Sequence, residues 1–244
     1  MSMLPVLLAA VFVAAPAAAT SRENDLAAVL RARVHDGRVD YASLKHHRTD
    51  LDAWLVWAAS VPQKRFDEWP RARRLALLIN VYNATTLRLV IDHYPIASIR
   101  KVGAFWDLKG PWRLPVVRLF GRTITLDELE QGVIRPQYAQ PRVHFALVCA
   151  AKGCPPLRGE PYIGTRLDAQ LDDQARAFLS QNGKNRADAK NRTAHLSPIF
   201  KWYMADFGGS RKSVLRFVKK WLPVEEDWGV SWTDYDWSLN EDKR

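Results

Sequence analysis

The chain of 244 residues is strongly basic, with 36 Lys and Arg against 26 Asp and Glu and a formal net charge of +10. Its length suits one large domain with a hydrophobic core. No zinc-finger spacing and no basic–aromatic RNA-binding motif occurs, which excludes the common nucleic-acid-binding modules. The excess charge favours an anionic partner, whereas the shortness of every basic cluster favours charge scattered over a solvated surface.

The first 19 residues are uncharged and almost wholly apolar. This composition is typical of the apolar core of a signal peptide, and Ala17, Ala18 and Ala19 provide the small residues that signal peptidase requires. The segment is shorter than the about 20 apolar residues that span a bilayer, and Pro5 and Pro16 interrupt it. We therefore expect export and cleavage, giving a periplasmic or secreted mature chain over 20–244 that contains no transmembrane segment.

Three helices are predicted in the first part of the mature chain. Apolar residues recur at helical spacing over 21–34, 50–61 and 71–93, and a short extended piece is expected at 39–41. The third helix is apolar nearly all round, which is typical of a helix in the middle of a domain. Pro95 is expected to end it.

The second part of the chain mixes strands and helices. A β-hairpin is predicted over 112–125, followed by a helix over 126–134 that begins with a capping box of Thr125 and Glu128 and ends before Pro136. The elements expected after these are a buried strand over 143–149, a helix over 167–179, a strand over 193–196 and helices over 198–207 and 210–221.

The order of these elements lacks regular alternation of strands and helices, and one strand pair is a hairpin. This pattern predicts an α+β fold rather than a doubly wound sheet. We expect a single compact domain in which the central buried helix packs on a small mixed or antiparallel sheet with helices around it.

The segment 142–157 is the most informative for chemistry, because an apolar strand with His144 leads into a loop with both cysteines. Side chains alternate along a strand, so His144 and Cys149 would face opposite ways, whereas Cys154 on a returning loop could reach His144. Lys152 and the N–H groups of the loop would stabilise an anion. A thiolate, a neighbouring cation and an oxyanion hole are what a cysteine hydrolase or transferase needs.

The same two cysteines also suit a disulfide, which is the interpretation that we favour. In an exported protein, two cysteines five positions apart most simply close a short loop. Cys149 and Cys154 would then not be nucleophiles. The C-x4-C spacing differs from that of zinc fingers, and two further ligands would be needed. We therefore expect no metal and no cofactor.

Two further pairs of polar residues accompany the predicted helices. Asn80 and Asn83 lie three positions apart on the apolar helix, and a buried amide costs about 1–3 kcal/mol if it is unpaired. They are expected to fasten loops to the helix or to bind a substrate. Glu130 and Arg135 flank the short helix, either as a salt bridge or as a general acid and an anion anchor.

Several blocks of the sequence resemble the domain of unknown function 547 family and follow its order. These blocks are 79–83 (INVYN), 94–99 (YPIASI), 126–130 (LDELE), 144–149 (HFALVC), 154–157 (CPPL) and 200–203 (FKWY), followed by Asp206 and Phe207. Further similarity at 37–41 and 235–240 extends the family-like core to about 37–240. The family pattern often has His where Gln131 stands here. The resemblance implies one compact domain with Asn80, Asn83, Glu130, His144, Cys149 and Cys154 as characteristic polar positions, and it implies no established activity.

Two functions are compatible with these features. The favoured one is a structural or binding protein of the cell envelope, with a Cys149–Cys154 disulfide and a basic surface that meets an anionic envelope component. The alternative is a thiol-dependent hydrolase or transferase acting on a peptide, amide or thioester. Its candidate catalytic residues are Cys154, Cys149, His144 and Glu130, and its candidate substrate-binding residues are Asn80, Asn83, Arg135 and Lys152.

Overall fold

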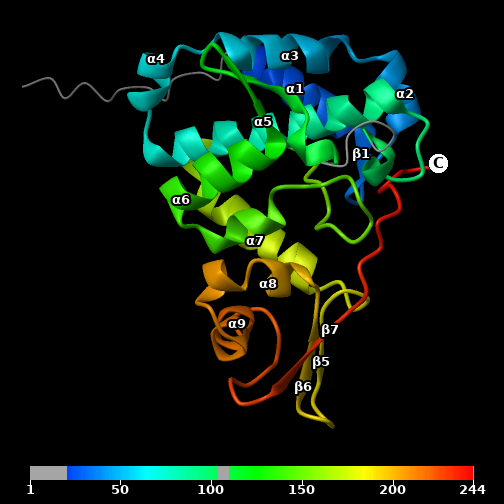
Figure 1. Ribbon diagram of the computed structural model, residues 1–244, viewed down its shortest axis with the longest axis vertical. Helices are drawn as coiled ribbons and strands as arrows, with labels where there is room; N and C mark the ends of the chain where they lie inside the picture. Colours follow the sequence, from blue (N-terminus) through cyan, green and yellow to red (C-terminus); the bar gives the residue numbers. More distant parts are fainter. Residues whose placement is uncertain (1–20, 104–109, 244) are drawn as a thin grey trace, which may run out of the picture.

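Helix α5 (Arg71–His93) lies at the centre of an α+β domain (Figure 1). The computed structural model describes residues 21–103 and 110–243, so the predicted signal peptide lies outside the described residues. Nearly every side chain of α5 between Leu75 and Ile91 is buried. By length and composition α5 would also suit a membrane span, but 89% of its apolar window is buried inside the fold. The prediction of a central buried helix is confirmed.

The elements before α5 pack around it in one half of the molecule (Figure 1). The helices predicted over 21–34, 50–61 and 71–93 are present within about one residue at each end, whereas α2 and α4 were not predicted. The elements are α1 (Ser21–Arg33), β1 (Val34–His35), β2 (Arg38–Val39), α2 (Tyr41–His46), α3 (Thr49–Ser60) and α4 (Gln63–Asp67). The predicted extended piece at 39–41 is shorter than expected, because Asp40 caps α2 and starts a helix at Tyr41.

The predicted hairpin follows α5 as β3 (Pro115–Leu119) and β4 (Arg122–Thr125), which pair antiparallel. Between α5 and the hairpin lie the short 3-10 helices η1 (Ile99–Lys101) and η2 (Pro111–Arg113). The capping box is formed, since Thr125 N–H donates to the Glu128 carboxylate at 2.7 Å and Glu128 N–H donates to Thr125 Oγ1 at 2.9 Å.

The sequence predicted that the helix after the hairpin ends before Pro136, and this prediction was wrong. The helix runs on as the π-helix η3 (Glu128–Ile134) and then α6 (Arg135–Tyr138). The N–H of Arg135 donates to the carbonyl of Glu130, five residues back. This wider turn carries the chain past Pro136, which lacks an N–H group, without a break. The same π-helical turn bears Glu130 and Gln131.

Residues 143–149 are not a strand, and this prediction was wrong. The chain forms the 3-10 helix η4 (Pro141–Phe145) and continues as irregular backbone. The local bond from Ala146 N–H to the Val143 carbonyl spans 2.8 Å. A short buried apolar run does not distinguish a strand from a helical turn by periodicity. Contrary to the prediction from the sequence, His144 and Cys149 therefore do not lie on opposite faces of a strand.

The remaining elements build the other half of the molecule (Figure 1). They are η5 (Gly164–Arg166), α7 (Leu167–Leu179), β5 (Arg186–Asp188), β6 (Thr193–Leu196), α8 (Ile199–Trp202), η6 (Met204–Phe207), α9 (Arg211–Val218) and β7 (Gly229–Trp232). Strand β6 pairs antiparallel with β5 and parallel with β7, which makes a small mixed sheet. The helix predicted over 198–207 is split into α8 and η6, and Gly208, in the left-handed region, ends it.

Buried apolar side chains form two clusters. The first surrounds α5, and the second joins α7, α8 and α9 to the three-stranded sheet. The tail after β7 returns along the first half of the molecule toward β1 (Figure 1). There Asn240 accepts a hydrogen bond from the N–H of Val39 at 3.0 Å, and its side chain accepts one from the Tyr41 hydroxyl at 2.7 Å. Tyr235 in this tail packs against both clusters.

Candidate functional site

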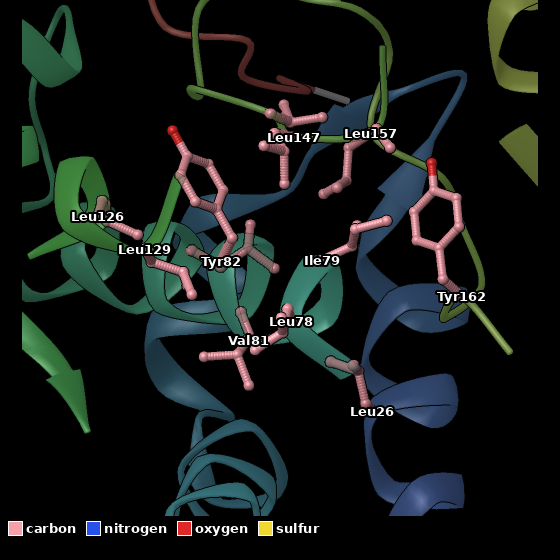
Figure 2. Packing of buried hydrophobic residues seen from close by; sticks show 14 of the residues in the cluster. Leu26, Leu78, Ile79, Val81, Tyr82, Leu126, Leu129, Leu147, Leu157 and Tyr162 are labelled. Atoms are coloured by element: carbon pink, nitrogen blue, oxygen red, sulfur yellow. The ribbon is translucent and has the colours of Figure 1, made fainter. Parts of the chain in front are cut away.

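A pocket of about 290 Å³ lies where the elements of the two clusters meet. Helix α5 provides Tyr82, the π-helix η3 provides Glu130 and η4 provides His144. Figure 2 shows the Tyr82 side chain beside Leu147, which also lines the pocket. Both cysteines lie in another part of the wall. The fold therefore brings together all four residues that the sequence singled out for catalysis.

Glu130 is a buried acid in this pocket, with 7% of its surface exposed. Burial raises the pKa of Glu130 above its ordinary value, although hydrogen bonds from Tyr203 and Tyr82 and the charge of Arg135 act in the opposite direction. Burial also raises the pKa of both tyrosines, so they remain hydrogen-bond donors. Glu130 therefore retains its proton to a higher pH than an exposed glutamate does.

His144 is held by a charged pair. Its Nε2 lies 2.7 Å from Asp206 Oδ2, while the guanidinium of Arg135 donates to both Asp206 oxygens at 2.7 and 2.9 Å. The hydrogen bond from Arg135 keeps the pKa of Asp206 below its ordinary value. Burial lowers the pKa of His144 to about 4, outweighing the effect of Asp206. Near neutral pH the imidazole is thus uncharged, with its proton on Nε2, because the Asp206 carboxylate can only accept.

Tyr203 connects these two groups. Its ring stacks on the imidazole of His144 at 3.9 Å between centroids, and the Arg135 guanidinium lies over the same ring, 5.2 Å from its centroid. Its hydroxyl is a hydrogen-bond partner of Glu130. Arg135 also donates to the side chain of Gln131. The sequence alternative of a Glu130–Arg135 salt bridge is wrong, because Arg135 pairs with Asp206 instead.

The two cysteines lie at disulfide distance. Their Sγ atoms are 2.14 Å apart and their Cα atoms 6.2 Å apart, within the usual span for a bridge. Cys154 is only 3% exposed, whereas Cys149 is partly exposed. The hydroxyl of Tyr235 lies 3.1 Å from Cys149 Sγ and 3.2 Å from Cys154 Sγ. The sulfur pair thus forms a wall of the pocket with a hydroxyl against it.

Three tryptophans line the pocket beside the sulfur pair. Trp237 lies 5.9 Å from Trp112 and stacks on Trp202 at 6.0 Å between ring centroids, and Tyr235 lies 4.9 Å from Trp202. Trp202 is 49% exposed. Large apolar side chains exposed at a concave site are typical of surfaces that contact a ligand. The exposed indole of Trp202 thus offers apolar surface to a bound molecule.

Asn80 and Asn83 are not part of the lining of this pocket, because their amides bind backbone groups. Asn80 donates to the carbonyl of Tyr162 and accepts from its N–H, both at 2.9 Å. Asn83 donates to the carbonyl of Ala146 and accepts from the N–H of Val148, again at 2.9 Å. Each side chain replaces the partner that a neighbouring strand would provide. They fasten loops to α5, which was the first of the two roles considered for them.

Several N–H groups of the loop between the cysteines already have backbone partners. The N–H groups of Lys152 and Gly153 donate at 2.8 Å to carbonyls of the C-terminal tail, and the N–H of Cys154 donates at 3.1 Å within the loop. The side chain of Lys152 is exposed and is not part of the pocket lining. The returning tail therefore uses the N–H groups of Lys152 and Gly153, two of the anion-stabilising donors that the sequence suggested.

The arrangement is suited to proton transfer and hydrogen bonding. Glu130, with its raised pKa, can donate a proton, and the neutral imidazole of His144 can accept one. Within residues 21–103 and 110–243 no group of three or more His, Cys, Asp or Glu is arranged to hold a metal ion.

Four polar residues of the site were not singled out from the sequence, namely Tyr82, Tyr203, Asp206 and Tyr235. Three of them stand in the blocks that resemble the family, and Tyr235 opens the segment that extends the resemblance. Membership of a block was the only signal that could have found them. Their contacts join positions far apart in the chain, such as His144 and Asp206, which are 62 positions apart.

Comparison with known proteins identifies one family. Residues 66–179 match the family model described as "Protein of unknown function, DUF547". This range contains Glu130, His144 and both cysteines, whereas Tyr203 and Asp206 lie beyond its end. No curated protein and no solved structure shows a significant match to the chain.

Proposed function

The chain belongs, through residues 66–179, to the DUF547 family, whose description assigns no activity, and from the pocket we propose that it is an envelope protein that binds a small neutral ligand. The observation that carries this proposal is the meeting of Glu130, His144 and three tryptophans in one pocket of about 290 Å³. That volume is near the lower end of the range for small-molecule sites.

The charges in the pocket favour a neutral ligand over an ionic one. The carboxyl of Glu130 is buried and its pKa is raised. When ionised, this carboxylate repels an anionic ligand. When protonated, it offers a ligand a hydrogen bond but no charge. His144 is uncharged near neutral pH. The half-exposed indole of Trp202 suits contact with a ring. A neutral ring compound with hydroxyl or carbonyl oxygens, such as a sugar, satisfies all three conditions.

A Cys149–Cys154 disulfide is part of this proposal. The 2.14 Å between the sulfurs supports it, and so does the oxidising compartment that the apolar N-terminal segment implies. The bridge would hold the pocket wall against the C-terminal tail. The net charge of +10 supports contact of the outer surface with an anionic envelope component.

Ligand binding is tested by tryptophan fluorescence of the mature protein, since Trp112, Trp202 and Trp237 line the pocket. The probes are N,N′-diacetylchitobiose as a neutral sugar, choline as a cation and benzoate as an anion. We expect saturable quenching by the sugar and a much smaller response to the two ions. Trp202→Ser and Glu130→Gln should each weaken the response at least fivefold.

Absence of any saturable response to the three probes would overturn the binding proposal, as would a response that both variants leave unchanged. A stronger response to choline than to the sugar would overturn the neutral class of ligand. Val56→Ser serves as a control, because Val56 is 67% exposed and lies outside the pocket lining. Its response should equal that of the wild type.

A second candidate function is a thiol-dependent hydrolase or transferase acting on a peptide, amide or thioester. It is supported by one observation, the presence of Cys149, Cys154 and His144 in the lining of the same pocket. Sulfurs joined in a disulfide are not nucleophiles, so this function requires a reduced pair. Alkylation of the intact, unreduced protein followed by mass spectrometry separates the two candidates. Two unlabelled cysteines favour binding, and one rapidly labelled thiol at neutral pH favours the enzyme.

Export is tested by recovering the protein from an expression host in separate envelope and cytoplasmic fractions. N-terminal sequencing should find a mature chain beginning near Thr20 in the envelope or the medium. An unprocessed chain that begins at Met1 and stays in the cytoplasm would contradict the proposed compartment.

A further inference from the structure

The two cysteines of the pocket wall are not equivalent. Both sulfurs face the same cavity, but Cys149 is partly exposed whereas Cys154 is 3% exposed. A small molecule in the pocket therefore meets Cys149 more readily than Cys154. In an exchange reaction the more accessible sulfur is attacked and the other one leaves.

Two hydrogen-bond donors converge on the sulfur of Cys154. The N–H of Cys149 donates to Cys154 Sγ at 2.9 Å, and the hydroxyl of Tyr235 donates at 3.2 Å. The same hydroxyl lies 3.1 Å from Cys149 Sγ, so the backbone N–H is the donor that distinguishes the two sulfurs. Burial raises the pKa of Tyr235, so the hydroxyl keeps its proton. Hydrogen bonds to a charged acceptor are about twice as strong as those to a neutral one. Both donors consequently stabilise a thiolate on Cys154 more than a sulfur in a disulfide.

The hydroxyl of Tyr235 is held in this place by close packing. A Cβ at Gly153 would lie 2.8–2.9 Å from three atoms of the Tyr235 ring, so only glycine permits the ring to lie so close to the loop. The N–H of Gly153 also donates to the carbonyl of Asp236 at 2.8 Å. The rings of Trp202 and Tyr235 are also in contact, with 4.9 Å between their centroids. The donor is therefore positioned before any reaction.

From this geometry we infer that the sulfur pair undergoes thiol–disulfide exchange with low-molecular-weight thiols that enter the pocket, with Cys149 attacked and Cys154 as the leaving group. The inference rests on the disulfide of the proposed function, and it is independent of the neutral ligand. The size of the pocket, about 290 Å³, admits a small thiol.

The exchange is balanced without any other reactant. A small thiol loses its proton to solvent, and its thiolate attacks Cys149 Sγ. A new sulfur–sulfur bond forms as the Cys149–Cys154 bond breaks, and the electron pair leaves on Cys154 Sγ. A second thiolate then attacks the small-molecule sulfur of this mixed disulfide, whose bond to Cys149 Sγ breaks with the electron pair on Cys149 Sγ. The two protein thiolates take up from solvent the two protons that the small thiols lost. Two small thiol molecules are thereby oxidised to one symmetrical disulfide, and the protein is reduced to a dithiol. Oxidised small disulfides drive the same steps in reverse.

The inference is tested on the full mature protein with glutathione as the probe. The native protein is equilibrated with reduced and oxidised glutathione, the thiols are alkylated, and the masses give the fraction reduced. We expect reduction of the folded protein within minutes by millimolar glutathione. Tyr235→Phe keeps the ring against Gly153 and removes the donor, so the exchange equilibrium constant should fall about tenfold, equivalent to about 30 mV.

Tyr162→Phe is the matched control, because the Tyr162 hydroxyl is buried without a hydrogen-bond partner among the described residues. Tyr82 and Tyr162 lie on opposite sides of Ile79 (Figure 2), and Tyr162 is not part of the pocket lining. This variant should exchange like the wild type. Circular dichroism confirms that each variant is folded.

Trapping distinguishes the roles of the two sulfurs. With oxidised glutathione, Cys154→Ser should accumulate a glutathione adduct on Cys149, and Cys149→Ser should form at least tenfold less adduct on the buried Cys154. Equal adducts on the two variants would overturn the assigned roles. A disulfide that glutathione reduces only after denaturation would overturn the exchange while leaving the proposed function intact. Free thiols in the protein as isolated from the envelope would instead overturn the disulfide itself.

Discussion

Two pairs of buried polar residues in this molecule differ in what they bind. Asn80 and Asn83 on α5 exchange hydrogen bonds with backbone groups only, each with one donor and one acceptor. Glu130 and His144 are equally buried but bind side chains, and both line the pocket. Burial of a polar group therefore does not identify a site by itself. The partners distinguish two kinds of buried residue. A fastening residue, as we call Asn80 and Asn83, binds backbone groups and joins a loop to α5. A site residue binds ionisable side chains and can exchange protons.

The comparison predicts opposite effects on stability. Loss of a fastening residue leaves buried backbone groups unpaired and destabilises the fold. Loss of a site residue removes a buried ionisable group and can stabilise it, as is common where function imposes a cost on stability. Substitutions at the two kinds of residue should therefore differ in their effect on the free energy of unfolding.

Asn83→Ala is expected to have the largest effect. It leaves the carbonyl of Ala146 and the N–H of Val148 without their partners, and at about 1–3 kcal/mol for each group the unfolding free energy should fall by about 4 kcal/mol. Urea denaturation measures the change. Asn191→Ala, an exposed asparagine bonded to Asp188, is the control and should change stability by about 0.5 kcal/mol or less. A loss below about 1 kcal/mol for Asn83→Ala would contradict its role as a fastening.

The pH dependence of stability should reveal His144. Its folded-state pKa of about 4 lies below the unfolded value of about 6.5, so the unfolded chain binds the proton first as the pH falls. Its contribution is present above pH 6.5 and is lost as the pH falls toward 4, by about 3 kcal/mol. His144→Gln should remove this part of the slope between pH 7 and 4, as measured by denaturation at each pH. Parallel curves for the two proteins would refute the assignment.

Glu130→Gln should raise stability. The folded-state pKa of Glu130 is raised, so its contribution is present below the unfolded pKa and is lost as the pH rises through the folded pKa. At neutral pH the neutral amide should therefore be more stable by about 1 kcal/mol, and the gain should disappear near pH 4. Glu128→Gln is the control, since the exposed Glu128 only caps the helix. That variant should be slightly less stable at neutral pH.

Trp202→Ser should have the smallest effect on stability. Because the indole is 49% exposed, thermal unfolding should change by the equivalent of about 1 kcal/mol or less. The response to a pocket ligand should nevertheless weaken, which places Trp202 with the site rather than with the fastenings. A loss of several kcal/mol would show instead that the indole is part of the core.

Local features of the sequence determined the helices α1, α3, α5 and α7, the hairpin and the capping box at Thr125. Each depends on hydrogen bonds between near neighbours and on a periodic apolar face, both of which are visible in a short window. The family-like blocks also marked Glu130, His144, Cys149 and Cys154 as positions of interest. The α+β class followed from the order of these elements.

The tertiary structure alone decided how the site is built. Residues 143–149 look like a strand in the sequence, but Asn83, more than sixty positions away, provides the hydrogen bonds that a neighbouring strand would provide. In the same way Asp206 selects Arg135 and His144, and Tyr235 reaches the sulfurs from the returning tail. Such partners are chosen by the packing of the whole chain, so a local pattern identifies which groups need partners but not which groups satisfy them.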